Sequence, residues 1–88
     1  MTNSMTTLPN TLGFSTVSAL LPQADTLIAS GALDLSGVTR ADSAGISLLL
    51  ELNRRAQARG VQLRMTGANE QIRSLLSFFG LDEILTLA

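Results

Sequence analysis

A carboxylate and a hydroxyl stand side by side near the middle of the chain, directly before a run of aliphatic residues. They belong to Asp42 and Ser43, and the next two residues, Ala44 and Gly45, have almost no side chain. At the start of a helix, this combination could bind a phosphate, accept one, hold a catalytic nucleophile, or lie flat against another protein. The remaining composition decides among these chemistries.

Catalysis at this junction lacks a base. The chain contains no His, no Cys and no Lys, so no imidazole or amine can activate the Ser43 hydroxyl, and thiolate and imidazole metal ligands are missing. Asp42 is adjacent to Ser43, and adjacency does not provide the facing geometry that general-base catalysis needs. A phosphate loop of the GxxxxGKS/T type is excluded, because its Lys is missing and Gly37 and Gly45 form no Gly-rich cradle. We therefore expect a protein that is not an enzyme and has no cofactor.

Size and charge exclude further classes. The chain has 88 residues, of which 45% are hydrophobic, and a net charge of −1, which predicts one small domain with one core. Its six basic residues are spread out, so no basic stripe is available for nucleic acid or anionic lipid, and three Phe are too few to stack bases. The N-terminal segment does not resemble a secretory signal, and no apolar run could span a membrane. We expect a cytoplasmic protein.

The elements that position the junction follow from the apolar pattern. Residues 1–10 are rich in Thr, Ser and Asn and are predicted to form a flexible arm or a weak edge strand, while Thr11 to Val17 could form a short strand. From Ser18 onward a single apolar stripe predicts a helix with Pro22 in its first turn and Gly31 at its end. The stripe consists of Leu20, Leu21, Ala24, Leu27 and Ile28.

A strand and a long helix flank the junction itself. The segment ALDLSGV alternates, which predicts a strand with Leu33 and Leu35 buried. The helix is predicted from Ser43 to about Arg59, with Asp42 or Ser43 as its cap. Its expected inner stripe consists of Leu48, Leu49, Leu52 and Ala56, widened by Gly45, Ile46 and Leu50.

Another strand and another helix complete the pattern. The segment VQLRMT alternates, with Val61, Leu63 and Met65 expected inside. Asn69 is positioned to cap a helix over Glu70 to Phe79, and Ile84 precedes a last short strand. The helix is expected to bury Ile72, Leu75, Leu76 and Phe79. The alternation of helices and strands predicts a single α/β domain over residues 11–88, in which a small parallel or mixed sheet packs against amphipathic helices.

Two interpretations of the junction remain open on residue chemistry. In the first, Asp42 or Ser43 simply caps the helix, which is worth about 1 kcal/mol, and Ala44 and Gly45 are small because a strand packs nearby. In the second, the small residues leave the helix end bare, so that a partner protein can approach its free N–H groups. Gly45 favours the second interpretation, because Gly within a helix costs roughly 1 kcal/mol relative to Ala.

Three motifs, LDLSGVTRADSAGI, RGVQLRMTG and IRSLLSFFGLDEIL, in this order resemble a STAS domain over about Leu33 to Leu85. Anti-sigma-factor antagonists, sulfate-transporter tails and a subunit of a bacterial lipid transporter share that fold. In the switchable antagonists the loop resembles D-S-S-G, and the Ser directly before the Gly is phosphorylated. That position is Ala44 here. The resemblance therefore implies that phosphorylation could be retained only at Ser43.

The loop resembles a second branch of the family more closely. In the MlaB-like STAS subunit of Mla-type phospholipid ABC transporters the loop resembles D-T-G-G, with a hydroxyl at the position of Ser43 and no acceptor before the Gly. The segment from Leu20 to Pro22, with the helix and Gly that follow, also resembles that branch. The resemblance implies a non-catalytic cytoplasmic subunit of a system for outer-membrane lipid asymmetry. Such a subunit binds the transporter ATPase and reaches the inner membrane only through it.

We therefore predict a partner-binding surface at the bare helix end. It consists of Asp42, Ser43, Ala44, Gly45 and Ser47, with Arg40 and Asn69 as a polar rim. The expected partner is an ABC transporter ATPase, and the alternative is an anti-sigma-factor kinase that the chain would bind as an antagonist, with Ser43 as a possible phosphorylation site. A third interpretation is an apolar cleft for a small ligand such as a lipid, lined by Phe78 and Phe79.

Overall fold

The strands form two small parallel sheets in this computed structural model, which describes residues 8–87. In the first sheet β1 (Thr11–Leu12) pairs with β3 (Arg40–Ala41). In the second, β4 (Arg64–Thr66) lies between β2 (Ala32–Asp34) and β5 (Thr86–Leu87), and both pairs are parallel. The arm predicted over residues 1–10 falls mainly on residues 1–7, which lie outside the described part of the chain.

The alternation predicted for the two central strands is confirmed. Leu33 and Met65 face each other in the register of β2 and β4, and both are buried. Leu35 and Leu63 are fully buried as well, whereas Asp34 is exposed. One face of this sheet therefore contributes directly to the core.

The first helical segment starts earlier than its apolar stripe indicates. The structure has α1 at Phe14–Leu20, a 3-10 turn η1 at Leu21–Gln23, and α2 at Ala24–Ile28. The expected strand over Thr11 to Val17 is therefore wrong beyond Leu12. The Gly13 N–H donates to Thr16 Oγ1 at 3.0 Å, and the N–H groups of Thr16 and Val17 donate to the Gly13 carbonyl at 2.9 Å, which caps α1. Pro22 stands at the interruption, where its missing N–H removes a helical hydrogen bond.

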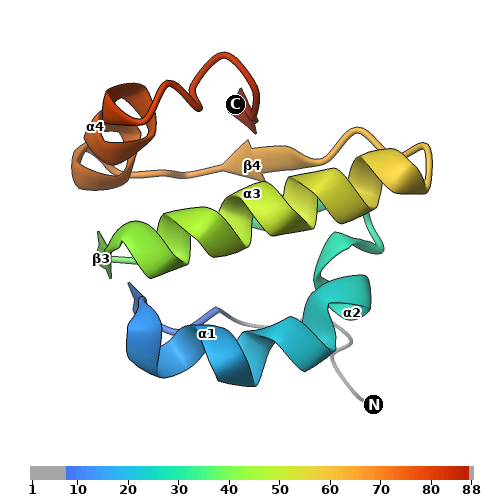
Figure 1. Cartoon of the computed structure of the whole chain (residues 1–88), viewed down its shortest axis with the longest axis horizontal. Helices are drawn as coiled ribbons and strands as arrows, with labels where there is room; N and C mark the ends of the chain where they lie inside the picture. Colours follow the sequence, from blue (N-terminus) through green and yellow to red (C-terminus); the bar gives the residue numbers. More distant parts are fainter. Residues whose placement is uncertain (1–7, 88) are drawn as a thin grey trace.

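The long central helix was predicted almost to the residue: α3 runs over Ser43–Ala58. Its inner stripe, Leu48, Leu49, Leu52 and Ala56, is buried. Leu50 is the exception, since 37% of it is exposed. On the outer side the Glu51 carboxylate accepts hydrogen bonds from Arg54 and Arg55, and these bonds lower the pKa of Glu51 to about 2. Figure 1 shows α3 crossing the molecule, with α1 and α2 on one side and β4 and α4 on the other.

The last helix, α4 (Glu70–Phe78), buries Ile72 and Leu76 as predicted. Leu75 is only half-buried, and Phe79 and Ile84 are exposed by 47% and 53%, so the predicted burial of Phe79 is wrong. The reason is the turn at Gly80, whose φ is +73°. The Leu81 N–H reaches back to the Leu76 carbonyl at 2.8 Å, which closes the helix. Leu81 packs against the core, and the three residues after it are exposed before Leu85 is buried again.

The core lies between α3 and the strands. Its largest fully buried side chains are Leu12, Ile28, Leu35, Val38, Leu48, Leu49, Leu52, Leu63, Met65, Ile72 and Leu76. Some of them belong to α3, and the others come from β1, α2, α4 and the segments around β2 and β4. Apolar burial therefore fixes these other elements against α3. None of the described helices is both long enough and apolar enough to cross a membrane.

Candidate functional site

Asp42 caps two helices at once. Its Oδ1 accepts the N–H of Gly45 in the first turn of α3 at 3.1 Å, and its Oδ2 accepts the N–H of Phe14 at the start of α1 at 3.2 Å. These bonds, the one from Gly45 first, hold the pKa of the Asp42 carboxyl below its usual range. Although Asp42 is exposed, its two oxygens are engaged inside the protein. These bonds give Asp42 a structural role at the amino end of α3, and its contact with a partner stays a prediction.

Gly45 is small for an internal reason. It is buried, and a Cβ on it would lie 2.6 Å from the carbonyl carbon of Leu12 and 2.8 Å from the Leu12 Cβ. The backbone of β1 thus occupies the space that a side chain would need. The argument that Gly45 is bare in order to admit a partner is wrong, and the interpretation in which a strand packs nearby is confirmed for this residue. Ala44 is half-buried.

Asn69 also has an internal role. Its Oδ1 accepts the N–H of Ile72 at 2.9 Å, which confirms the predicted cap of α4. Its Nδ2 donates to the carbonyls of Val38 and Thr39 at 3.3 and 3.0 Å. Asn69 therefore connects the loop before β3 to α4. Arg40, the other residue of the predicted polar rim, is exposed on β3.

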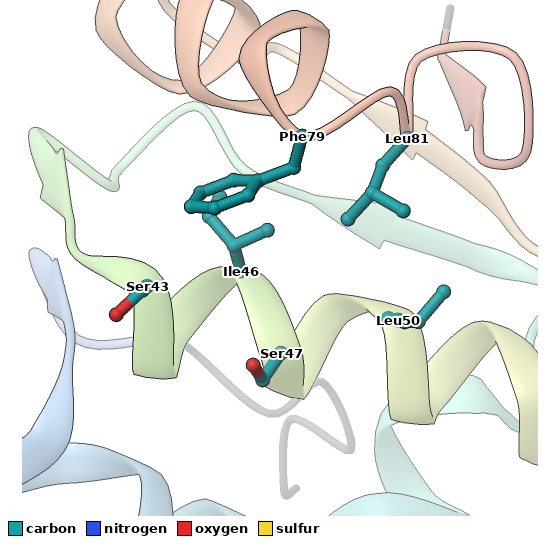
Figure 2. A pocket seen from close by; sticks show the side chains of 6 residues that line it. All are labelled: Ser43, Ile46, Ser47, Leu50, Phe79 and Leu81. Carbon is teal, nitrogen blue, oxygen red and sulfur yellow. The ribbon is translucent and has the colours of Figure 1, made fainter.

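A shallow groove lies beside the two serines that were predicted for the surface. Ser43 and Ser47 are exposed one turn apart on α3, and the groove that they border has a volume of about 270 Å³. Figure 2 shows Phe79 and Leu81, from the end of α4 and the turn after it, facing α3, with Ile46 pointing toward them. The complete lining is Ser43, Ile46, Ser47, Leu50, Phe79 and Leu81.

Of the residues that line the groove, Phe79 and Leu81 were absent from the predicted partner surface. The sequence places Phe79 either in the core beneath the last helix or, with Phe78, in a small-ligand cleft, and in the structure only Phe79 lines the groove. Phe78 is 81% exposed and does not line the groove, while its ring meets that of Phe79 edge-on with centroids 5.3 Å apart. Gly80 is the sequence feature that could have indicated the position of Phe79 and Leu81. A glycine at the end of a helix turns the chain, so that the residues beside it no longer follow the buried face of the helix.

The lining of the groove is mainly apolar. It presents two hydroxyls and four apolar side chains, with no ionisable group in its lining. In the described part of the chain, no group of three or more acidic residues lies close enough together to hold a metal ion. Leu50 and Phe79 are exposed, Leu81 is half-buried and Ile46 is buried beneath them, so the groove is a partly exposed apolar surface bordered by hydroxyls. Protein-contact patches have a similar composition.

Comparisons with known proteins identify the family and the fold of the chain. The family model described as "Mlab, STAS domain" matches residues 5–87. Among solved structures, a candidate anti-sigma factor antagonist from Thermotoga maritima is similar with a TM-score of 0.77 and 22% identity. The similarity covers 91% of this chain and 74% of the other. No curated protein matches. The family model covers most of the chain, and the fold agrees with it. This chain therefore belongs to the STAS domain family.

Proposed function

We propose that this chain is a non-catalytic STAS subunit that binds the ATPase of a Mla-type phospholipid ABC transporter. The observation that carries the proposal is the apolar groove along the amino-terminal half of α3, bordered by the exposed hydroxyls of Ser43 and Ser47. The family model that matches is the one described by the name MlaB. In this proposal the subunit is cytoplasmic and reaches the inner membrane only through the ATPase.

The position of Ala44 supports this branch of the family. Ala44 has no hydroxyl where the loop of switchable antagonists carries its phosphate acceptor. Ser43, the remaining hydroxyl, is the first residue of α3 and is exposed. A constitutive contact at this point requires no modification, because a neutral hydroxyl can donate or accept one hydrogen bond at the border of an apolar patch.

The dimensions of the groove favour a protein side chain as its occupant. Its 270 Å³ lies just below the roughly 300–1,000 Å³ of typical small-molecule pockets. The groove is also open along α3, whereas a lipid chain would require enclosure on most sides. An aliphatic or aromatic side chain of the ATPase, inserted between Leu50 and Phe79, would bury apolar surface that is otherwise in water.

The test is capture by the purified ATPase of a Mla-type transporter from the same organism. Ser47→Arg places a long charged side chain on the border of the groove in mid-helix, and Ser43→Arg does so at the first turn. The matched control is Ser74→Arg, an exposed serine on α4 that lies about 140° around the helix axis from Phe79. We expect both groove variants to lose capture and the control to retain it, with unchanged circular dichroism spectra. Capture of both groove variants at the wild-type level would contradict the proposal.

A second candidate function is that of an anti-sigma-factor antagonist. The similarity of the fold to a candidate antagonist favours it, as does the exposure of Ser43 at a helix amino terminus, where a phosphate is electrostatically favourable. Incubation with a serine kinase from the same gene neighbourhood, followed by intact-mass measurement, tests this function. A mass gain of one phosphate that disappears in Ser43→Ala would support it, and an unchanged mass would count against it.

A further inference from the structure

Gln71 is exposed on α4, and both polar atoms of its side-chain amide bind one buried residue. Its Oε1 accepts the N–H of Ala41 at 3.1 Å, and its Nε2 donates to the Ala41 carbonyl at 3.0 Å. The two residues are 30 positions apart in sequence. A glutamine that satisfies both backbone groups of a single residue reproduces the hydrogen bonding that a neighbouring strand would provide.

The strand β3 needs such a partner on this edge. Its other edge is paired with β1: the N–H groups of Arg40 and Asp42 donate to the carbonyls of Asn10 and Leu12 at 3.3 and 3.1 Å. Backbone groups alternate in direction along a strand, so the polar groups of Ala41 point to the opposite edge. Ala41 is 93% buried, being only 7% exposed, so water cannot easily replace a lost partner there.

The bond between Gln71 and Ala41 connects the two walls of the groove. Ala41 directly precedes Asp42, which caps α3, and α3 provides one wall with Ser43 and Ser47. Gln71 lies in the first turn of α4, and the end of that helix provides the other wall with Phe79. The amide of Gln71 therefore holds the amino end of α3 at a set position relative to α4.

We propose that Gln71 is a positioning residue for partner binding, which acts by fixing the amino end of α3 through the backbone of Ala41. This inference rests on the proposed function, in which the groove between α3 and α4 contacts the partner. Asn69 makes two further bonds to the same loop, but it is also the cap of α4, so its replacement would change the stability of the helix itself. Gln71 is not a cap and is the cleaner residue to test.

The test compares three variants in the full chain. Gln71→Met keeps the length of the side chain and removes both hydrogen bonds, whereas Gln71→Glu keeps an acceptor for the Ala41 N–H and loses the donor. The matched control is Gln57→Met, an exposed glutamine near the other end of α3. We expect the Kd for the purified ATPase to rise about tenfold in Gln71→Met and to stay at the wild-type value in Gln57→Met. In Gln71→Glu the Kd should rise at least as much as in Gln71→Met, because the second carboxylate oxygen would face the Ala41 carbonyl.

Amide hydrogen exchange measured by NMR provides a readout that does not need the partner. In Gln71→Met, we expect faster exchange at the amides of Ala41 and Gly45, with the Leu76 amide in the core as slow as in the wild type. Unchanged exchange at Ala41 and Gly45 would overturn the inference. Equal acceleration at Leu76 would also overturn it, because Gln71 would then act on global stability alone.

The two proposals can fail separately. If the wild-type chain does not bind the ATPase, the proposed function fails, and the exchange pattern alone then decides whether Gln71 holds the amino end of α3. If the wild-type chain binds and Gln71→Met binds with the same Kd, the proposed function survives and the role of Gln71 is refuted.

Discussion

Gly45→Ala should destabilise the protein, although the same change in an ordinary helix would stabilise it by roughly 0.5–1 kcal/mol. The new Cβ would lie 2.6 Å from the carbonyl carbon of Leu12 and 2.8 Å from its Cβ. The atoms that would have to move belong largely to the backbone of β1, and that backbone accepts the Asp42 N–H at 3.1 Å. Relief of the clash would therefore break the pairing of β1 with β3.

The expected magnitude follows from these contacts. Overpacking costs about 1–3 kcal/mol, and a clash with backbone belongs at the upper end of that range, so about 2 kcal/mol of net loss remains after the gain of up to about 1 kcal/mol in helix propensity. For a domain of this size, that loss corresponds to a decrease in Tm of about 8–16 °C. Thermal and urea unfolding followed by circular dichroism would measure it. The matched control is Gly37→Ala, where an added Cβ has no heavy atom within 4 Å. A Gly45→Ala variant that melts at or above the wild-type temperature would refute the reasoning.

Two further predictions concern stability. The N–H groups of Gly45 and Phe14 lower the pKa of the Asp42 carboxyl in the folded state. The ionised carboxylate therefore stabilises the fold fully above the unfolded-state pKa of about 3.9, and this stabilisation is lost as the pH falls through the lower folded-state pKa. Urea unfolding between pH 7 and pH 2 should therefore show a flatter acid limb for Asp42→Asn than for the wild type, and parallel curves would contradict the double cap. Leu49→Ala truncates a side chain of the inner stripe of α3 that is 0% exposed. The free energy of unfolding, measured in urea, should fall by about 2–5 kcal/mol. A decrease below about 1 kcal/mol would show that Leu49 does not lie in a packed core.

The parts of the fold that depend on local patterns could be predicted from the sequence. The bounds of α3 follow from the Asp42 cap and from Gly60, because a capping carboxylate and a left-handed glycine act within one turn. The Asn69 cap and the buried pair Ile72 and Leu76 are of the same kind. Such features need only the residues on one helix.

The parts that depend on contacts between distant segments could not be predicted. The start of α1 at Phe14 uses the carboxylate of Asp42, which is 28 residues away, and the missing side chain of Gly45 is explained only by the position of Leu12. The site shows the same division. Ser43 and Ser47 share a face by helical spacing, whereas Phe79 joins them only because α4 ends beside α3.

The double cap at Asp42 has a consequence for any attempt to imitate the surface with a peptide. A synthetic helix that carries Ser43 and Ser47 would keep the local bond from Asp42 to Gly45, but it would lose the bond to Phe14 and the support of Gln71. A mimetic inhibitor would therefore require three chain segments that are not contiguous in sequence, joined on one scaffold.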